Sequence, residues 1–489
     1  MDLLGLDIGT TSCKALLLSP DGETQFVASK EYPLHYPGPG LVELDPYEVW
    51  EAVGDLIKRA AKHSNGAIRA IAVSSHGESV TPVARDGRAL HNSITSLDTR
   101  ATGLLPGFLA EVGKGESERI TNIPLHYKHS LFKYKWFREN EPKVFERTSK
   151  FLCYQDLITT WLGAEPAISP SLAARTMAFD SEKLSWSRKH LDYAGISEGM
   201  LPSIAGSGEK VGQVSRKNLV DFGLKGPVDI VSGGHDQCCA MLGAGALGLD
   251  SAVDSIGTVE ALMLNAPPGI SSGTVVSRGY PVYPHVLRGR KVVMAVNPNA
   301  GSAMRWFREN IAESAAPGED AYEAIVDNCR GCQPGLIVLP FFAGRGTPDA
   351  DPEAKALFSG MTLSTTRYDI AWAIFESLAF ELRLNLEAMQ QEDSKIEGMV
   401  AVGGGSKSAS VVQLRADVLG IPVKLPRIKE AAALGAAILA GTGSGTFNSI
   451  EEAVRKSVGY DAHLAPDTSK RDYYEARFLK YCEHRNSRA

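Results

Sequence analysis

The feature that most constrains the fold is a short hairpin pattern that occurs twice, about half a chain length apart. Near the start, an apolar run leads into Asp7-Ile8-Gly9-Thr10-Thr11-Ser12, and a second apolar run follows. The turn recurs in Ser255-Ile256-Gly257-Thr258, again between apolar stretches. Two apolar runs joined by a small polar turn predict a β-hairpin. Either hairpin alone could be a plain structural turn, but the pair predicts two related domains with a cleft between them.

Both turns carry groups that suit phosphate. Gly9 lets the backbone approach a ligand closely. Thr10, Thr11 and Ser12 offer backbone N–H groups and hydroxyls for phosphate oxygens, and Gly257 with Thr258 repeats this chemistry in the second half. Asp7 ends the first strand, and its carboxylate suits Mg²⁺, which prefers oxygen ligands and keeps part of its water shell.

Composition excludes several classes of protein. A chain of 489 residues is too long for one core. The net charge is −6 and there is no long basic run, so neither nucleic acid nor an anionic membrane is expected as a partner. No leader or long apolar segment stands out, which favours a cytoplasmic location. Cys329 and Cys332 have no second CxxC pair to complete a zinc site, so we interpret them as part of a loop before strand 336–342.

Strands alternate with helices along the chain, which indicates α/β domains with buried strands. The boundary is expected near residues 245–249, which gives domains 1–247 and 248–489. Beyond the hairpins, strands are expected at 68–73, 227–231, 292–296, 336–342, 399–402 and 423–425, and helices at 45–61, 130–140, 238–248, 302–310, 368–390 and 430–441, with a further helix ending at residue 419.

Asp236 is the best candidate for a catalytic group. It follows strand 227–231 in a loop with two glycines, the position where α/β proteins place ligand sites. A carboxylate there can accept a proton from an attacking substrate hydroxyl. Asp236 could equally cap the following helix. His235, its neighbour, could donate to the substrate or hydrogen-bond the loop, and the loop is the favoured interpretation.

Several other polar residues are candidates for substrate binding. His76 and Glu78 follow strand 68–73, and Asp98 and Arg100 follow a turn. Carboxylates accept hydrogen bonds from sugar hydroxyls, and an arginine can orient them. With Gln237 these residues form the predicted substrate site, although each taken singly is more often a surface residue.

A glycine-rich turn in the second half is a candidate nucleotide loop. Gly403, Gly404, Gly405 and Ser406 lie between a strand and a helix. The turn is not a Walker A motif, and such turns are common without ligands. The segment 430–437, rich in alanine, is by default a helix that packs closely on its neighbours.

Together these segments resemble the FGGY family of carbohydrate kinases over residues 3–441. The most specific match is the stretch from Ala356-Leu357-Phe358-Ser359-Gly360-Met361 to Phe375-Glu376, which resembles the C-terminal family signature. The resemblance implies two actin-like (ribonuclease-H-like) domains that close on ATP and a sugar. It implies Asp236 as the base, Mg²⁺ held mainly through water by Asp7, and Lys14 as the basic residue of the first phosphate loop. Residues 403–406 and 430–437 then look like the adenosine-binding loop and its adjoining helix.

The chain departs from the family pattern near the expected substrate. Lys128 stands where the family has an aromatic or small residue, with Tyr127 beside it as a substitute, and Gly77-Glu78 replaces the Arg-Glu of glycerol kinases and the Met-His of xylulokinases. The resemblance implies a ketopentose substrate first and a polyol such as glycerol second, and a homodimer as in many members. An actin-like ATPase and a sugar sensor without kinase activity are the rival interpretations, and sugar-dependent ATP turnover separates them.

Overall fold

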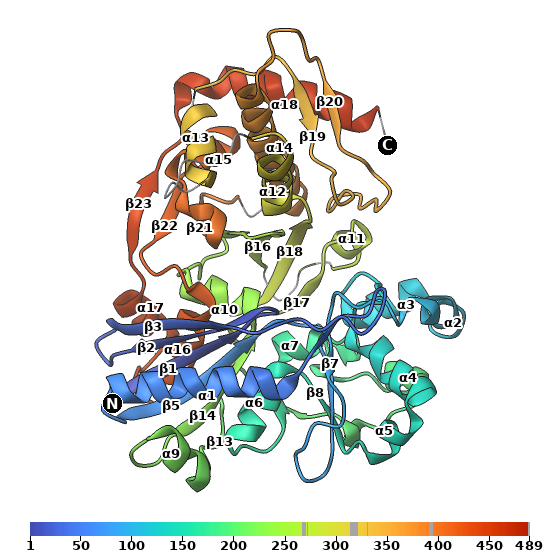
Figure 1. Cartoon of the computed structure of the whole chain (residues 1–489), viewed down its shortest axis with the longest axis vertical. Coiled ribbons are helices and arrows are strands. Elements are labelled where there is room, and N and C mark those ends of the chain that lie inside the picture. The colour runs from blue at the N-terminus through green and yellow to red at the C-terminus, as the bar shows by residue number, and fades with distance from the viewer. Residues whose placement is uncertain (267–269, 271, 313–320, 330, 391–394, 488–489) are drawn as a thin grey trace.

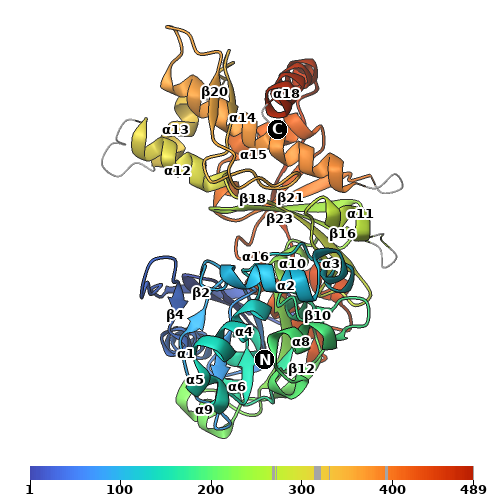
Figure 2. The same cartoon turned by 90° about the vertical axis from the view of Figure 1, so that its right-hand side faces the viewer.

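The computed structural model describes residues 1–266, 270, 272–312, 321–329, 331–390 and 395–487. It contains two large mixed β-sheets, one in each half of the chain, with helices packed on them (Figure 1). Figure 2 shows the same two lobes from the side.

The first sheet is built around the N-terminal hairpin. β1 (Asp2–Ile8) pairs antiparallel with β2 (Ser12–Leu18), which places Asp7 opposite Lys14. β3 (Thr24–Glu31) extends the hairpin. On the other side of β1, β5 (Ile68–Ser75) and β14 (Asp229–His235) run parallel to it, and β13 (Lys210–Gln213) closes the edge. The strand order is β13-β14-β5-β1-β2-β3.

The second sheet repeats this connectivity. Its order is β17-β18-β16-β15-β21-β22-β23, in which β15 and β16 form the second hairpin and β21 and β22 run parallel to β15. Each sheet therefore has an antiparallel meander on one side of its first strand and parallel strands on the other. The predicted α/β fold with two related lobes is confirmed. The strands are β15 (Ser251–Ile256), β16 (Glu260–Ala266), β17 (Val282–Pro284), β18 (Lys291–Asn297), β21 (Gly398–Val402), β22 (Val423–Pro426) and β23 (Tyr460–Leu464).

Helices and short strand pairs complete both lobes. The helices are α1 (Pro46–His63), α2 (Leu105–Glu111), α3 (Lys114–Thr121), α4 (Ser130–Asn140), α5 (Pro142–Arg147), α6 (Tyr154–Leu162), α7 (Pro170–Ala174), α8 (Arg188–Ala194), α9 (Arg216–Phe222), α10 (Asp236–Gly243), α11 (Ser272–Ser277), α12 (Ala300–Asn310), α13 (Ala321–Cys329), α14 (Arg367–Met389), α15 (Ala409–Leu419), α16 (Ala431–Gly443), α17 (Ile450–Ser457) and α18 (Arg471–Asn486). The short pairs are β4 (Glu43–Leu44) with β7 (Ser93–Ile94), β6 (Thr81–Val83) with β8 (Lys150–Leu152), β9 (Ala167–Ile168) with β12 (Ser203–Ile204), β10 (Phe179–Asp180) with β11 (Ser185–Trp186), and β19 (Ile337–Leu339) with β20 (Leu357–Ser359).

Local sequence signals explain where the longest helices begin. Asp45 caps α1 because its carboxylate accepts the Tyr47 N–H at 2.8 Å, and Pro46 fits the first turn. At the start of α14, the Thr366 and Asp369 side chains each accept the backbone N–H of the other, which is a capping box.

The glycine pair before Asp236 lies in a strand, whereas the sequence predicted a loop. β14 continues to His235, and its pairing with β5 shifts register between Val231 and Gly234. A Cβ at Gly233 would lie 2.0 Å from the carbonyl oxygen of Val73. Glycine is therefore required there for the bulged strand to approach its neighbour, and α10 starts immediately at Asp236.

Helix α16 follows the second sheet in sequence but packs on the first. It lies against α10, β1 and β5, and Figure 1 shows it beside the N-terminal strands. A Cβ at Gly435 would lie 1.9 Å from the Cys239 carbonyl oxygen, and one at Gly5 would lie 1.9 Å from that of Ala433. The small residues of segment 430–437 thus allow close helix packing, as the sequence predicted.

Candidate active site

Three carboxylates lie at one edge of the first sheet because three neighbouring strands end there. Asp7 is near the end of β1, Glu78 follows β5, and Asp236 follows β14. These strands are parallel, so their carboxyl ends meet at the same edge, which is the usual ligand position in α/β sheets.

Asp236 is held in an environment that favours its protonated form. Burial, followed by the negative charge of Asp7, raises the pKa of Asp236 to about 8. The His235 Nε2 lies 3.3 Å from an Asp236 carboxylate oxygen, and the Gln237 backbone N–H donates to that same oxygen at 2.6 Å. The Gln237 side-chain oxygen is buried and has no partner among the described residues, so Gln237 keeps an acceptor available for a ligand.

Asp7 is a second carboxylate with a raised pKa, and it lies beside the first hairpin turn. The Ser74 hydroxyl donates to Asp7 at 2.9 Å, and burial raises the pKa of Asp7 to about 6 against the opposing effect of Lys14. Lys14 lies 2.5 Å from Glu430, the N-cap residue of α16. The hairpin therefore joins the first sheet to a helix from the second half of the chain.

Two hydrogen bonds fix the backbone of the first hairpin turn. The Gly9 N–H donates to the Ser12 carbonyl oxygen at 2.9 Å, and the Tyr32 hydroxyl donates to the Gly9 carbonyl oxygen at 2.6 Å. Thr10 and Thr11, at the tip of this turn, are at least partly exposed. The turn keeps a defined shape with its hydroxyls accessible, as a phosphate loop requires.

Glu78 is strongly fixed and ionised. It has a positive φ of 65°, which is unusual for a residue other than glycine. Its carboxylate forms an ion pair with Arg175, and its carbonyl oxygen accepts from the Lys133 ammonium at 2.6 Å and the Ser130 hydroxyl at 3.0 Å. Burial alone would raise the pKa of Glu78, but the positive charges around it, Arg175 first and then Lys128, together hold the pKa well below its usual range.

Sequence reasoning missed Arg175 and Tyr283. A Cβ at Gly77 would lie 2.9 Å from the Arg175 Cβ, so the glycine leaves room for the arginine. The Arg175 guanidinium carbon lies 5.2 Å from the centre of the Tyr283 ring, and the Tyr283 hydroxyl lies 3.1 Å from the His235 Nδ1. The one signal in the sequence was Glu78 beside a glycine, because a buried carboxylate needs a cation from elsewhere in the chain.

His76, Asp98 and Arg100 have protein partners. The His76 ring nitrogens lie 3.0 Å from the Ile8 carbonyl oxygen and 2.7 Å from the Ser79 hydroxyl. Arg100 bonds both Asp98, at 2.8 Å, and Glu43, at 2.7 Å. The contacts found for these side chains connect β1, β4 and the neighbouring loops, and substrate binding by the three residues stays a prediction.

The predicted nucleotide residues of the second half come together around one cavity. It has a volume of about 430 Å³, and Gly257, Thr258, Gly404 and Gly405 line it. Gly403 has a φ of 85°, and a Cβ there would lie 2.7 Å from the Ile256 carbonyl oxygen, so both the backbone angle and the close approach require glycine. The Ser406 hydroxyl closes the turn by donating to the Gly403 carbonyl oxygen at 2.8 Å.

Arg415 lines the same cavity and was missed by sequence reasoning. It donates to Asp254 of β15 at 3.0 Å and to Glu260 of β16 at 2.6 Å, so it links the two strands of the second hairpin. Arg305, which also lines the cavity, donates to the Thr258 hydroxyl at 3.4 Å.

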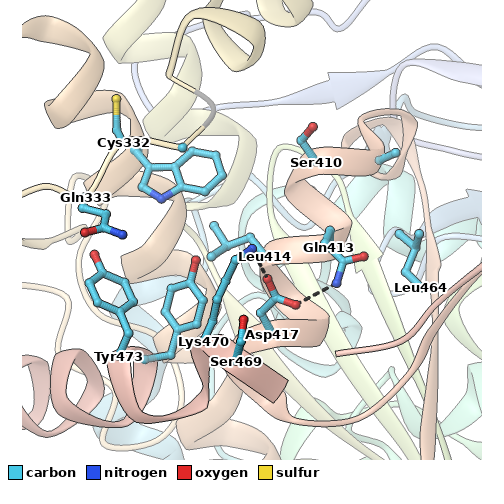
Figure 3. Close-up of a pocket in the computed structure, with 14 residues that line it drawn as sticks. Cys332, Gln333, Ser410, Gln413, Leu414, Asp417, Leu464, Ser469, Lys470 and Tyr473 are labelled. Atoms are coloured by element: carbon cyan, nitrogen blue, oxygen red, sulfur yellow. Dashed lines mark hydrogen bonds and ion pairs between the residues drawn. The ribbon is translucent and has the colours of Figure 1, made fainter. Parts of the chain in front are cut away.

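A larger cavity of about 710 Å³ lies elsewhere in the second lobe (Figure 3). It is lined by residues of α14, α15 and the segment leading into α18, with Asp417 bonded to Lys470 at 3.1 Å and to Gln413 at 2.7 Å. Cys332 borders it as a free thiol, and Cys329 is buried and free.

Within the described ranges no cluster of three metal-binding side chains is found, and no helix there is long and apolar enough to span a bilayer.

Comparison with known proteins agrees with this geometry. Family models described as FGGY family of carbohydrate kinases match residues 3–243 (N-terminal domain) and 252–444 (C-terminal domain). A glycerol kinase from Saccharolobus islandicus (strain M.16.27) is 31% identical over 481 residues, which cover 96% of this chain and 93% of that relative. Crystal structures of a ligand-bound xylulose kinase and a gluconate kinase, both from Lactobacillus acidophilus, are each 25% identical, with TM-scores of 0.90 and coverage of 99% of this chain and 98% of the other. The expected pair of actin-like domains is confirmed. This chain therefore belongs to the FGGY family of carbohydrate kinases and is an ATP-dependent kinase of a sugar or polyol.

Proposed function

We propose that Asp236 is the general base that accepts a proton from a hydroxyl of the substrate. The hydroxyl oxygen attacks the γ-phosphorus of ATP, the bond to the bridging oxygen breaks, and ADP leaves. The observation that carries the proposal is the position of Asp236 beside Asp7 and Glu78 at one sheet edge, with a pKa raised to about 8. A base with a pKa near the working pH is effective because it combines proton affinity with a sizeable ionised fraction.

The two hairpin turns are proposed to hold the phosphates of ATP from both sides. Thr10, Thr11, Ser12 and Lys14 belong to the first lobe, and Gly257, Thr258 and residues 403–406 belong to the second. The cavity of about 430 Å³ beside Thr258 supports this division, since a nucleotide needs a pocket of roughly this size. Phosphoryl transfer depends mainly on such positioning and on charge stabilisation.

Asp7 is proposed to hold Mg²⁺, mainly through water. A single carboxylate suits this ion, which keeps several waters and binds substrate phosphates, and the residues that the structure describes hold no cluster of further metal-binding side chains. When bound, Mg²⁺ would neutralise charge on the β- and γ-phosphates. The half-buried carboxylate of Asp7 would gain from a nearby cation, since its partial removal from water disfavours its charge.

The sugar itself stays a prediction. Glu78, His76, Asp98, Arg100 and Gln237 remain the proposed contacts to its hydroxyls. The xylulose kinase structure supports a ketopentose, and the glycerol kinase relative supports a polyol as second candidate. The cytoplasmic location and the homodimer also stay predictions.

The experiment is an ATP turnover assay on the purified protein with ketoses, alditols and aldonates. We expect sugar-dependent ADP release, and a loss of three or more decades of kcat in Asp236→Asn, the scale expected for a central catalytic group. Asp221→Asn, at an exposed residue of α9, is the matched control. Turnover of Asp236→Asn near that of the control would exclude Asp236 as the base. ATP hydrolysis that needs no sugar would favour an actin-like ATPase, and sugar binding without product would favour a sensor.

A further inference from the structure

We propose that the substrate is a sugar acid, and that Arg175 and Lys128 form an anion subsite that binds its carboxylate. The inference rests on the proposed function, because it concerns the substrate that Asp236 deprotonates. It replaces the ketopentose prediction with a different chemical class.

The first observation is that Arg175 has unused donors. Its side chain is 4% exposed, and one terminal nitrogen pairs with Glu78. The other two nitrogens, Nε and Nη1, are buried and have no hydrogen-bond partner among the described residues. Buried polar groups are nearly always satisfied, and a charged donor left without a partner is costly. A ligand that accepts hydrogen bonds from this guanidinium would remove that cost.

The second observation is an excess of positive charge. The Lys128 ammonium interacts electrostatically with both Glu78 and Arg175, and no ion pair to Lys128 is found in the described part of the chain. Lys133 lies close by and donates to the carbonyl oxygen of Glu78, but burial lowers the pKa of its ammonium to about 7, so it does not count as a full charge. The Glu78 carboxylate thus faces two cations, Arg175 and Lys128.

Neighbouring groups do not cancel this excess. Burial lowers the pKa of His129 and His235, so both rings are neutral near pH 7. Asp236 is the further carboxylate that interacts with Arg175, and the proposed reaction uses it for the hydroxyl proton. A neutral sugar would leave the subsite uncompensated, whereas a carboxylate would pair with it through charge-assisted hydrogen bonds.

The third observation is a series of side-chain contacts that connects the anion subsite to the base, Asp236. Arg175 stacks on Tyr283, the Tyr283 hydroxyl lies 3.1 Å from His235, and His235 lies 3.3 Å from Asp236. These contacts connect Arg175 to Asp236 through the side chains of Tyr283 and His235. This spacing suits a short acid whose carboxylate lies at Arg175 and whose attacked hydroxyl lies at Asp236.

The test compares matched compounds that differ in charge. D-Ribonate, ribitol and D-ribulose, and the four-carbon set of L-threonate, L-threitol and L-erythrulose, are assayed with ATP. We expect kcat/KM for the acid of at least one set to exceed that of its neutral partners by about 100-fold, as expected when a site is built for a polar group that the analogue lacks. A higher kcat/KM for a neutral compound would overturn the sugar-acid proposal and leave the kinase proposal intact.

Variants locate the subsite. Lys128→Met should raise KM for the acid at least tenfold, change kcat less than threefold, and leave KM for the alditol unaltered, whereas Lys143→Met, at an exposed residue of α5, should change none of these. Arg175→Lys should retain part of the affinity, because it keeps the charge but loses the planar guanidinium. Equal effects of Lys128→Met on the acid and the alditol would overturn the role of Lys128.

Calorimetry with the Asp236→Asn protein gives a readout without turnover. We expect the acid to bind this variant, and to bind tenfold more weakly when Lys128→Met is added. Failure of every acid to bind would overturn the sugar-acid proposal. Full turnover by Asp236→Asn would instead overturn the proposed function, so the two failures are distinguishable.

Discussion

Asp236 should lower the stability of the folded protein at the pH where it works. Its pKa is raised from 3.8 to about 8, chiefly by burial. An acid whose folded-state pKa is raised keeps its full stabilisation below the unfolded pKa and loses it as the pH rises through the folded pKa. The ionised carboxylate is therefore tolerated rather than favoured by the fold, as is common at functional sites.

We expect Asp236→Asn to be more stable than the natural protein by about 1–3 kcal/mol at pH 8, with the difference shrinking toward pH 4. The amide has nearly the same shape, can still accept the Gln237 N–H, and does not ionise. Thermal unfolding at several pH values measures the difference. A variant that is less stable at pH 8 would contradict the raised pKa.

The same carboxylate should determine the pH dependence of catalysis. The base must be ionised, so kcat/KM should rise with pH with a slope near one and level off at an inflection well above 4, the ordinary range for aspartate. The groups around Asp236 that modify this pKa are Asp7 and Glu78, which raise it, and Arg175, which lowers it. Initial rates between pH 5 and 9.5 with saturating MgATP test this. A flat profile down to pH 5 would contradict it.

At the residue scale, the sequence was most informative where chemistry follows a local pattern. Asp7 and Asp236 could be singled out because each follows an apolar strand beside glycine. Arg175 could not, because its partner Glu78 lies 97 residues away and the pairing depends on how α7 packs against the turn after β5. Side chains that act through long-range packing leave no periodic signal in the sequence.

At the scale of elements, α16 and α10 depend on the absence of side chains at their contact. The Cβ of an alanine at Gly435 would lie 1.9 Å from the Cys239 carbonyl oxygen, and one at Gly243 would lie 1.9 Å from that of Ala431. Both obstacles are backbone atoms, which cannot rotate away. The helices would have to separate, and that would disturb α10 at its first residue, Asp236.

We expect Gly435→Ala to lower stability by about 3 kcal/mol and to reduce kcat as well, since overpacking of a tight core usually costs 1–3 kcal/mol even where side chains can adjust. Gly107→Ala in α2 is the matched control, because no atom lies within 4 Å of its Cβ. That control should be neutral or stabilising by up to about 1 kcal/mol, the helix propensity gain of alanine. Denaturant unfolding compares the two, and equal midpoints would contradict the close packing.

Element boundaries also show where sequence patterns stop being sufficient. Helix 130–140 was predicted with its observed limits, and the helix from Asp45 was predicted to within two residues. The strand before Asp236 was predicted to end at 231 but reaches His235. Its last residues include Gly233 and Gly234, which resemble a loop in sequence, and only the closeness of β5 explains why a strand needs them.

At the scale of the whole molecule, the two halves of the sequence are interlocked. α16 follows the second sheet along the chain, yet it covers α10, β1 and β5 of the first, and Lys14 pairs with Glu430 at its start. A division at residue 247 separates the two sheets but also removes a central helix from the first lobe. The predicted domains 1–247 and 248–489 are therefore sequence units whose packing is shared.

We expect residues 1–247 expressed alone to be unfolded or aggregated, because removal of α16 exposes the sheet face that it covers, where Leu3 of β1 and Leu16 and Leu18 of β2 are fully buried. Co-expression with residues 248–489 should restore a complex with sugar-dependent ATP turnover. Circular dichroism, limited proteolysis and the kinase assay measure the outcome, with the intact chain as control. A cooperative thermal transition in the isolated 1–247 fragment would contradict the shared packing and would make the first lobe an independent folding unit.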